Sequence, residues 1–446
     1  MSGRPVAGAP RPYRFPDITR HALDNGLGVW LVPLPERALV SVQLLTDTGA
    51  AAEDEGQGGI ASLTAQALVT GTQRLDAAAF AETTEALGVD VSSESSWDSA
   101  RAGFTALGQH LEAGLDLLAE MLRTPRLDEG EFERMKSERL NDILQARTDA
   151  ARLADESFLR QVYAEGVPYG RLSAGTPDSV EALAVGDARA FHTTRYAPAV
   201  ADVVIAGAFD PDGALRLAEA ALGDWSGSAP GHRSIDARPR GGRRVVLVDR
   251  PGSVQSELRV GLVGIDRRHP RYFSAIVLGA LLGGVFRSRL NTRLREELGY
   301  TYGARSHFDP RRAAGPFTAS AAVQTEVTVD AIRELLGQLD RIRDEAAPDA
   351  ELREVRDYLV GVFPLRFETT AGIAAAIEPM AVYDLPDAWW QTYRGHLEAV
   401  GPTDVLEAAR ELIRPDELLI LVVGDAARIG DELADAGFGP VEAASL

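Results

Sequence analysis

The sequence predicts an α+β fold built from two homologous domains, each a mostly antiparallel sheet covered by helices. The chain has 446 residues, which is too long for one ordinary hydrophobic core and suits two domains of about 200 residues each. Strand-like and helical segments alternate through the first half, and the same order restarts near residue 244. The strand pattern of residues 201–207, with its following helix, also recurs about 217 residues later at 417–424.

The individual elements follow from hydrophobic periodicity and from turn and cap residues. In the first half we expect strands at 28–34, 39–45, 89–94, 99–107 and 201–207. Helices are expected there within 57–87, with a stop at Gly71 and an N-cap at Asp76, and at 109–123, at 129–164, from residue 178, and at 211–223. In the second half we expect strands at 244–249, 255–262, 300–308, 315–323 and 417–424. Helices are expected there at 270–298, across 327–413, and after residue 424.

The predicted domain boundaries follow composition. Residues 1–14 are Pro-rich and without periodicity, which predicts a flexible tail. A stretch rich in Gly, Pro, Arg and Ser at 227–244 predicts a linker. The two domains are then 15–226 and 245–446.

Composition excludes several classes of function. The net charge of −20 argues against nucleic-acid binding, which needs clustered cations. The chain has no cysteine, so it has neither disulfides nor a thiolate metal site. It contains no apolar run of transmembrane length and no signal-peptide pattern, and we therefore expect a cytoplasmic protein without a membrane partner.

A glycine-rich acidic loop and the helix after it carry the most informative pattern. Together with the helix end, this pattern resembles the active-site segment of the insulinase and mitochondrial-processing-peptidase family, through Gly49, Glu53, Gly59-Ile60-Ala61 and Gly71-Thr72. Further segments resemble the same family in the same order, at 23–31, 125–134 and 169–177. The resemblance implies two homologous α+β domains per chain that form half of a clamshell peptidase chamber.

The zinc ligands and the general base of that segment are absent from this sequence. Catalytic relatives carry the inverted zinc motif H-x-x-E-H directly after this glycine-containing triplet, and the three chemical positions fall here on Ser62, Ala65 and Gln66. The third zinc ligand of relatives, a glutamate, would fall near Asn141 and Asp142. One carboxylate cannot hold zinc, which needs three protein ligands in such a site. We therefore expect no metal and no cofactor in this chain, with the zinc carried by a partner.

A second segment keeps residues that could still serve catalysis. In the family, a glycine-containing loop, a helix and a strand carry an Arg-x6-Tyr pair that faces the zinc across the closed chamber. Gly283 and Gly284 match the loop, and Arg295 with Tyr302 matches the pair. Arg293 with Tyr300 has the same spacing and stays open as the alternative.

The resemblance implies a function for the whole chain. It predicts the non-catalytic, substrate-positioning subunit of a heterodimeric zinc metallopeptidase that cleaves peptides. The partner would be a homologue with H-x-x-E-H, which supplies the zinc and the general base, while Arg295 and Tyr302 contact the peptide. The alternative is a structural or peptide-binding scaffold protein without peptidase activity.

Overall fold

The strands form two sheets, one in each half of the chain. The computed structural model describes residues 11–444, so residues 1–10 of the predicted tail and the last two residues lie outside the described residues. The first half contains β1 (Thr19–Ala22), β2 (Gly28–Pro33), β3 (Leu39–Thr46), β4 (Asp90–Ser95), β5 (Ala100–Leu107) and β6 (Ala201–Gly207). The second half contains β7 (Arg244–Asp249), β8 (Gln255–Val263), β9 (Ala304–Phe308), β10 (Pro316–Gln324), β11 (Leu419–Gly424) and β12 (Val441–Ala444).

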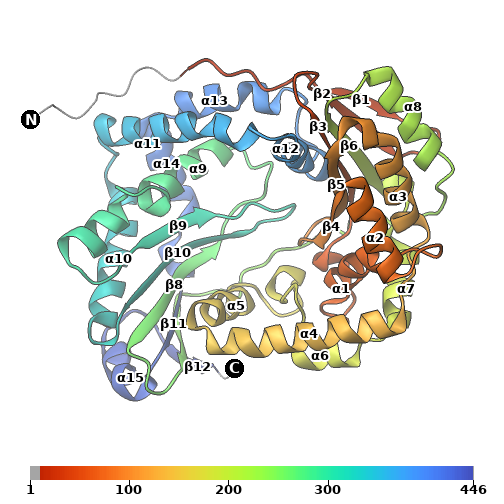
Figure 1. Cartoon of the computed structure of the whole chain (residues 1–446). Helices are drawn as coiled ribbons and strands as arrows, with labels where there is room; N and C mark the ends of the chain where they lie inside the picture. The colour runs from red at the N-terminus through yellow and green to blue at the C-terminus, as the bar shows by residue number, and fades with distance from the viewer. Residues whose placement is uncertain (1–10, 445–446) are drawn as a thin grey trace, which may run out of the picture.

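Five strands of each sheet share one arrangement, β2-β6-β3-β5-β4 in the first and β7-β11-β8-β10-β9 in the second (Figure 1). The first has the order β1-β2-β6-β3-β5-β4, and the second has the order β12-β7-β11-β8-β10-β9. Pairing is antiparallel except between β2 and β6, β7 and β11, and β7 and β12. The edge strands β1 and β12 were not predicted, and they differ between the halves because β1 is antiparallel to its neighbour. The predicted α+β fold with two homologous, mostly antiparallel halves is confirmed.

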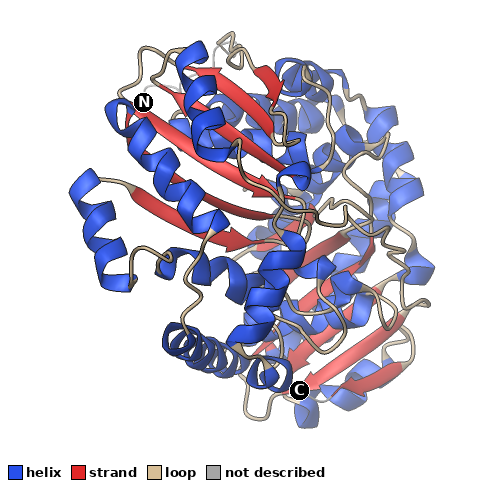
Figure 2. Ribbon diagram, turned by 90° about the vertical axis from the view of Figure 1, so that its right-hand side faces the viewer, coloured by secondary structure: helices blue, strands red, loops and turns tan. Residues whose placement is uncertain are grey.

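Helices cover both sheets. In the first half they are α1 (Ile60–Ala67), α2 (Ala77–Leu87), α3 (Leu111–Arg123), α4 (Glu129–Thr148), α5 (Ala150–Val162), α6 (Pro177–Ala182), α7 (Val185–Arg195) and α8 (Pro211–Leu222). In the second half they are α9 (Tyr272–Gly279), α10 (Thr328–Asp344), α11 (Asp349–Val362), α12 (Thr370–Val382), α13 (Trp389–Ala399), α14 (Pro402–Leu412) and α15 (Ala426–Asp435). Figure 2 shows these helices packed on the two sheets.

Two predicted helices are interrupted, and the physical causes are local. The helix expected at 129–164 breaks at Asp149, whose side chain accepts hydrogen bonds from the backbone of Ala151 and Arg152 and so starts α5. Within 57–87 the helical stretch stops at Gly71, which has φ 128°, and α2 starts at its N-cap Asp76, as predicted. The helix expected at 270–298 contains two π-helical segments, 280–284 and 291–297, separated by a loop.

One helix from each half packs against the sheet of the other half. Helix α5 packs on β8 and β11 of the second sheet, where Phe158 shares a buried cluster with Val246 and Leu421. Helix α12 packs on β3 and β6 of the first sheet, where Ile377 shares a buried cluster with Trp30. Figure 1 shows α5 and α12 on opposite sides of the molecule, one below and one above.

A buried polar cluster fixes the same contact between the halves. The carboxylate of Asp98 accepts hydrogen bonds from the Tyr169 hydroxyl at 2.6 Å and from the backbone N–H of Arg312 at 3.0 Å. Arg312 also forms an ion pair with Asp47. Because Asp98 and Tyr169 belong to the first half, they hold the loop between β9 and β10 of the second half in place.

The predicted domain boundaries remain a prediction. Residues 227–243 between the sheets contain no regular helix or strand. Among residues 11–444, no single helix is long and apolar enough to cross a membrane, although one bent pair, 349–367 with 370–382, meets the same length and composition test when both parts are combined.

The exchanged helices make a testable prediction about stability. Phe158 is 2% exposed, so Phe158→Ala should lower the free energy of unfolding by about 3–5 kcal/mol, through lost burial and a cavity between α5 and the second sheet. Because α5 joins the two halves, unfolding should remain one cooperative transition when followed by urea denaturation. Leu144→Ala, at a position that is 54% exposed, is the matched control and should change stability by less than about 0.5 kcal/mol. Equal effects of the two substitutions would contradict this account.

Candidate functional site

Helix α1 contains the positions of the zinc motif, and hydrogen bonds and a close backbone contact hold its first turn in place. The Oε1 atom of the Glu53 carboxyl group accepts hydrogen bonds from the backbone N–H groups of Gly59 at 3.1 Å and Ala61 at 3.0 Å. These are donors that the first turn of α1 leaves without an intrahelical partner. Gly59 has φ 96°, and a Cβ there would lie 2.8 Å from the carbonyl oxygen of Ala174, so only glycine fits.

An arginine lies between the residues at the zinc-motif positions. The Nη2 atom of Arg139, on α4, donates to Ser62 Oγ at 2.9 Å and to Gln66 Oε1 at 3.0 Å. Its Nη1 atom donates to the Ala174 carbonyl at 3.3 Å. Ala65 is fully buried, and Asp142 is exposed one turn further along α4. The structure therefore brings Ser62 and Gln66 together around a cation that the sequence analysis did not identify.

This set of side chains does not fit zinc. A hydroxyl and an amide oxygen replace the imidazoles that relatives use, and both already accept hydrogen bonds from the guanidinium of Arg139. Among residues 11–444, no group of three His, Cys, Asp or Glu side chains is placed to hold a metal ion. A positive charge at this place also repels a divalent cation. Arg139 therefore links α1 to α4 by hydrogen bonds within the protein itself.

Burial shifts the pKa values of Glu53 and Arg139. The Glu53 side chain is 2% exposed, and its Oε2 atom has no hydrogen-bond partner among the described residues. Desolvation raises the pKa of Glu53 to about 8, although the N–H groups of α1 and the nearby Arg171 and Arg139 act in the opposite direction. Desolvation also lowers the pKa of Arg139, against the attraction of Asp142 and Glu53.

The second predicted segment folds around a close backbone contact. A Cβ at Gly283 would lie 2.2 Å from the backbone nitrogen of Ser306 on β9, so the glycine allows the π-helical segment 280–284 to touch the edge of the sheet. The chain then passes through a loop with the exposed Phe286 into the second π-helical segment, 291–297. π-Helical turns are rare, and they are frequent at functional sites.

Four of the predicted residues line one hollow next to β9. Its volume is about 450 Å³, and its lining comes from the glycine loop, the second π-helical segment and β9: Gly283, Gly284, Val285, Phe286, Asn291, Arg295, Tyr302, Gly303, Ala304, Arg305, Ser306 and His307. The guanidinium carbon of Arg295 lies 4.4 Å from the ring centroid of Phe286. Tyr302 is 94% exposed, and it lies before β9, which starts at Ala304 and not at residue 300 as predicted.

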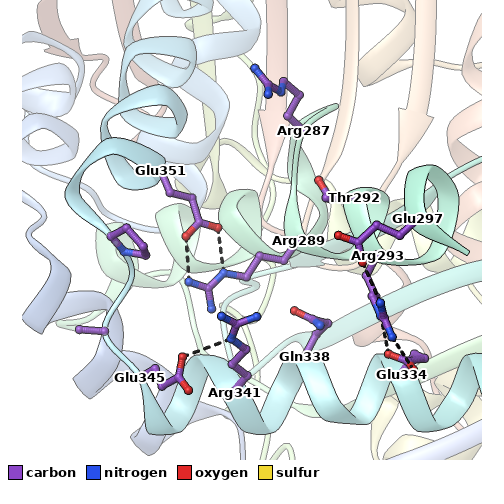
Figure 3. Close-up of a pocket in the computed structure, with 12 residues that line it drawn as sticks. Arg287, Arg289, Thr292, Arg293, Glu297, Glu334, Gln338, Arg341, Glu345 and Glu351 are labelled. Carbon is purple, nitrogen blue, oxygen red and sulfur yellow. Dashed lines mark hydrogen bonds and ion pairs between the residues drawn. The ribbon is translucent and has the colours of Figure 1, made fainter.

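The alternative pair, Arg293 and Tyr300, is placed differently. Arg293 lines a separate hollow of about 500 Å³ between the second π-helical segment, α10 and α11 (Figure 3). Its guanidinium is held by Glu334 at 2.7 and 3.0 Å and by Glu297 at 2.7 Å. Tyr300 is half-buried and packs against the core of the second half. Neither side chain lines the hollow that contains Arg295 and Tyr302.

Comparisons with known proteins agree with the fold and with the family resemblance. Residues 29–172 match the family model described as insulinase (peptidase family M16), and residues 182–359 match the model of the peptidase M16 inactive domain. An uncharacterized zinc protease of Streptomyces coelicolor is 24% identical over 436 residues, covering 94% of this chain and 93% of that protein. A non-peptidase homolog of Helicobacter pylori is 24% identical over 327 residues, covering 72% of this chain and 74% of that protein. The fold is similar to the crystal structure of a peptidase M16 inactive domain from Pseudomonas fluorescens, with a TM-score of 0.85 and 23% identity over 92% of this chain and 98% of that chain.

The position of Arg139 predicts the outcome of restoring the zinc motif. The quadruple variant Ser62→His, Ala65→Glu, Gln66→His, Asp142→Glu should retain no stoichiometric zinc after dialysis, because the Arg139 cation remains between the new ligands. Adding Arg139→Ala should allow zinc retention, with metal content measured by mass spectrometry and folding checked by circular dichroism. Stoichiometric zinc in the quadruple variant would show that Arg139 does not block the site.

The raised pKa of Glu53 predicts a pH dependence of stability. The folded state keeps a proton on Glu53 up to a pH of about 8, whereas the unfolded chain releases it near 4.5. Stability should therefore fall as the pH rises through this window, by at most about 1.4 kcal/mol per pH unit. Glu53→Gln should remove this loss in urea denaturation at pH 5, 6.5 and 8. The exposed neighbour Glu55, changed to Gln, is the control, and an identical pH profile for both variants would refute the assignment.

Proposed function

Because this chain belongs to the insulinase family, peptidase family M16, we propose that it is the non-catalytic subunit of a heterodimeric zinc metallopeptidase that cleaves peptides. The partner is a homologue that carries the complete H-x-x-E-H motif. This chain supplies one part of the chamber wall and the side chains of Arg295 and Tyr302. The complex acts in the cytoplasm.

One observation carries the proposal. Arg295 and Tyr302 line the same hollow, and the Tyr302 side chain is almost fully exposed. A tyrosine with this exposure contributes little to the core of its own chain, so its hydroxyl is free to meet a ligand or a partner. The same chain has Arg139 between its zinc-motif positions, which is why the metal is assigned to the partner.

The chemistry of the two side chains suits peptide cleavage. The guanidinium of Arg295 can donate two parallel hydrogen bonds to carbonyl oxygens of a peptide backbone. The hydroxyl of Tyr302 can donate to the oxyanion that forms when water attacks the scissile carbonyl. Zinc bound by the partner's H-x-x-E-H motif would lower the pKa of a bound water and so activate it for attack. Arg295 and Tyr302 therefore bind the peptide and stabilise charge, while proton transfer belongs to the partner.

A sheet edge suits an extended substrate. Strands β4 and β9 are the last strands on corresponding edges of the two sheets. The β9 edge is partly covered, because the backbone N–H of Ala304 donates to Asn291 Oδ1 at 2.8 Å and Gly283 packs against the backbone nitrogen of Ser306. The β4 edge has no strand partner among residues 11–444. A peptide that adds to such an edge is bound through its main chain and with broad sequence tolerance. Arg295 and Tyr302 lie next to the β9 edge.

A scaffold protein without any role in cleavage is the second candidate. The Helicobacter pylori relative named a non-peptidase homolog favours it. In that case substitutions at Arg295 and Tyr302 would change stability alone. The distinguishing test is to purify the tagged chain from its native host, sequence the co-purifying chain, and assay the complex for chelator-sensitive cleavage of a quenched peptide.

Tyr302→Phe tests the proposed role directly. Loss of one oxyanion donor should lower kcat about a hundredfold, equivalent to about 3 kcal/mol, while size-exclusion chromatography should show unchanged assembly with the partner. Tyr358→Phe, on α11 and 50% exposed, is the matched control and should leave kcat unchanged. Arg293→Met should also leave kcat unchanged, because Arg293 is held by Glu334 and Glu297 outside the hollow. Full activity of Tyr302→Phe would favour the scaffold.

A further inference from the structure

The hollow beside β9 differs in charge from the rest of the chain. The protein has a net charge of −20, yet the residues that line this hollow include Arg295, Arg305 and His307 and no aspartate or glutamate. By contrast, the lining of the hollow that contains Arg293 has glutamates beside its arginines. The first hollow, which we call the cationic hollow, is therefore a local positive site on an acidic protein.

Arg305 is available to a ligand. Along β9, buried and exposed side chains alternate, which puts Arg305 and His307 together on the exposed side of the edge strand. Their cross-strand neighbours on β10 are Ser320 and Thr318, which carry no charge. Among the described residues, Arg305 forms no hydrogen bond or ion pair through its side chain, whereas Arg293 is bound by two glutamates.

Arg295 is also only weakly engaged. Within residues 11–444 its single ion pair is a 3.4 Å contact with the adjacent Glu296, and its guanidinium lies over the ring of Phe286. Such stacking holds the guanidinium plane while leaving its edge free to donate hydrogen bonds. Two guanidinium groups without a strong carboxylate partner thus border one hollow.

We propose that the cationic hollow selects peptides with a single aspartate or glutamate at the position that docks beside Arg305 and Arg295. A guanidinium binds a carboxylate through two parallel charge-assisted hydrogen bonds, which a neutral side chain cannot form. The exposed rings of Phe286 and Tyr302 offer apolar surface to the methylene groups of the same side chain. The inference rests on the proposed function, because it assigns a substrate class to the proposed peptide site.

The acidic surface elsewhere limits the preferred substrate. Charges interact strongly only within a Debye length, about 8 Å at physiological salt, so the two arginines attract one nearby carboxylate while the remaining surface repels a run of them. The preferred segment is therefore neutral or basic with one acidic side chain. The acidic residue fixes the register of the peptide relative to Tyr302.

The test measures binding by this chain alone. Three fluorescein-labelled peptides of one neutral sequence, with Glu, Gln or Lys at a central position, are titrated with the full-length protein and followed by anisotropy. The Glu peptide should bind about two- to fivefold more tightly than the Gln peptide, as expected for a partly exposed ion pair, and the Lys peptide should bind most weakly. The preference for the Glu peptide should decrease when the salt concentration is raised from 50 to 500 mM.

Arg305→Glu provides the decisive comparison. Its side chain has no partner among the described residues, so the substitution should not disturb folding, and it should reverse the order so that the Lys peptide binds more tightly than the Glu peptide. Arg353→Glu, an exposed position on α11 that also has no side-chain hydrogen bond or ion pair among residues 11–444, makes the same change in net charge and should preserve the wild-type order.

Each other outcome overturns the proposal. The proposal fails if the three peptides bind with equal affinity, or if no binding is detected up to millimolar protein. It also fails if Arg305→Glu and Arg353→Glu change the order of peptide affinities in the same way. Because turnover and a partner are not needed, an acidic preference would survive failure of the heterodimer proposal. Conversely, a zinc-dependent complex that shows no such preference would leave the proposed function intact.

Discussion

The exchange of α5 and α12 is the contact on which the rest of the structure depends. A sheet with one face uncovered would expose a wide apolar surface, and here each sheet is covered by a helix that belongs to the other half. Arg259 of β8 adds a polar component, since it donates to Asp155 at 2.5 Å and to the Ala151 carbonyl at 3.0 Å, both on α5. The loop between β9 and β10 reaches Asp98 and Tyr169 by the same arrangement. The β9 edge and its hollow are thus fixed relative to the first half.

The degenerate zinc positions and the cationic hollow illustrate two uses of arginine. At Arg139 the guanidinium is buried and its hydrogen bonds go to Ser62, Gln66 and a carbonyl oxygen, so the charge serves to connect helices. At Arg295 and Arg305 the guanidinium groups border an open hollow, and the part of the chain that the structure describes gives them no strong carboxylate partner. The first arrangement is complete within the chain, while the second leaves hydrogen-bond capacity for another molecule.

The strands and the repeat could be predicted from the sequence because alternation and order are local properties. The break at Asp149 was missed because the helical pattern continues on both sides, and only the cap geometry shows that α4 ends there. The local sequence does not indicate which sheet α5 covers, because the apolar face of a helix can pack equally well on either sheet. Arg139 was missed for a related reason: its partners Ser62 and Gln66 are distant in sequence, and an arginine in a charged helix resembles a solvent-exposed residue. The spacing of seven fits Arg293 and Arg295 equally, and only the direction of each side chain from the π-helical segment separates them.

The reciprocal packing of α5 and α12 also relates this chain to a dimer of two half-length chains. Two separate half-length chains that exchanged α5 and its counterpart α12 would form a domain-swapped homodimer with two-fold symmetry. Its folding would depend on subunit concentration, as in an obligate dimer. The segment 227–243 joins the two copies covalently, which replaces a bimolecular association by an intramolecular one with a high effective concentration. Once joined, the two copies can differ, and here the first half carries Arg139 beside Ser62 and Gln66 while the second half carries the cationic hollow.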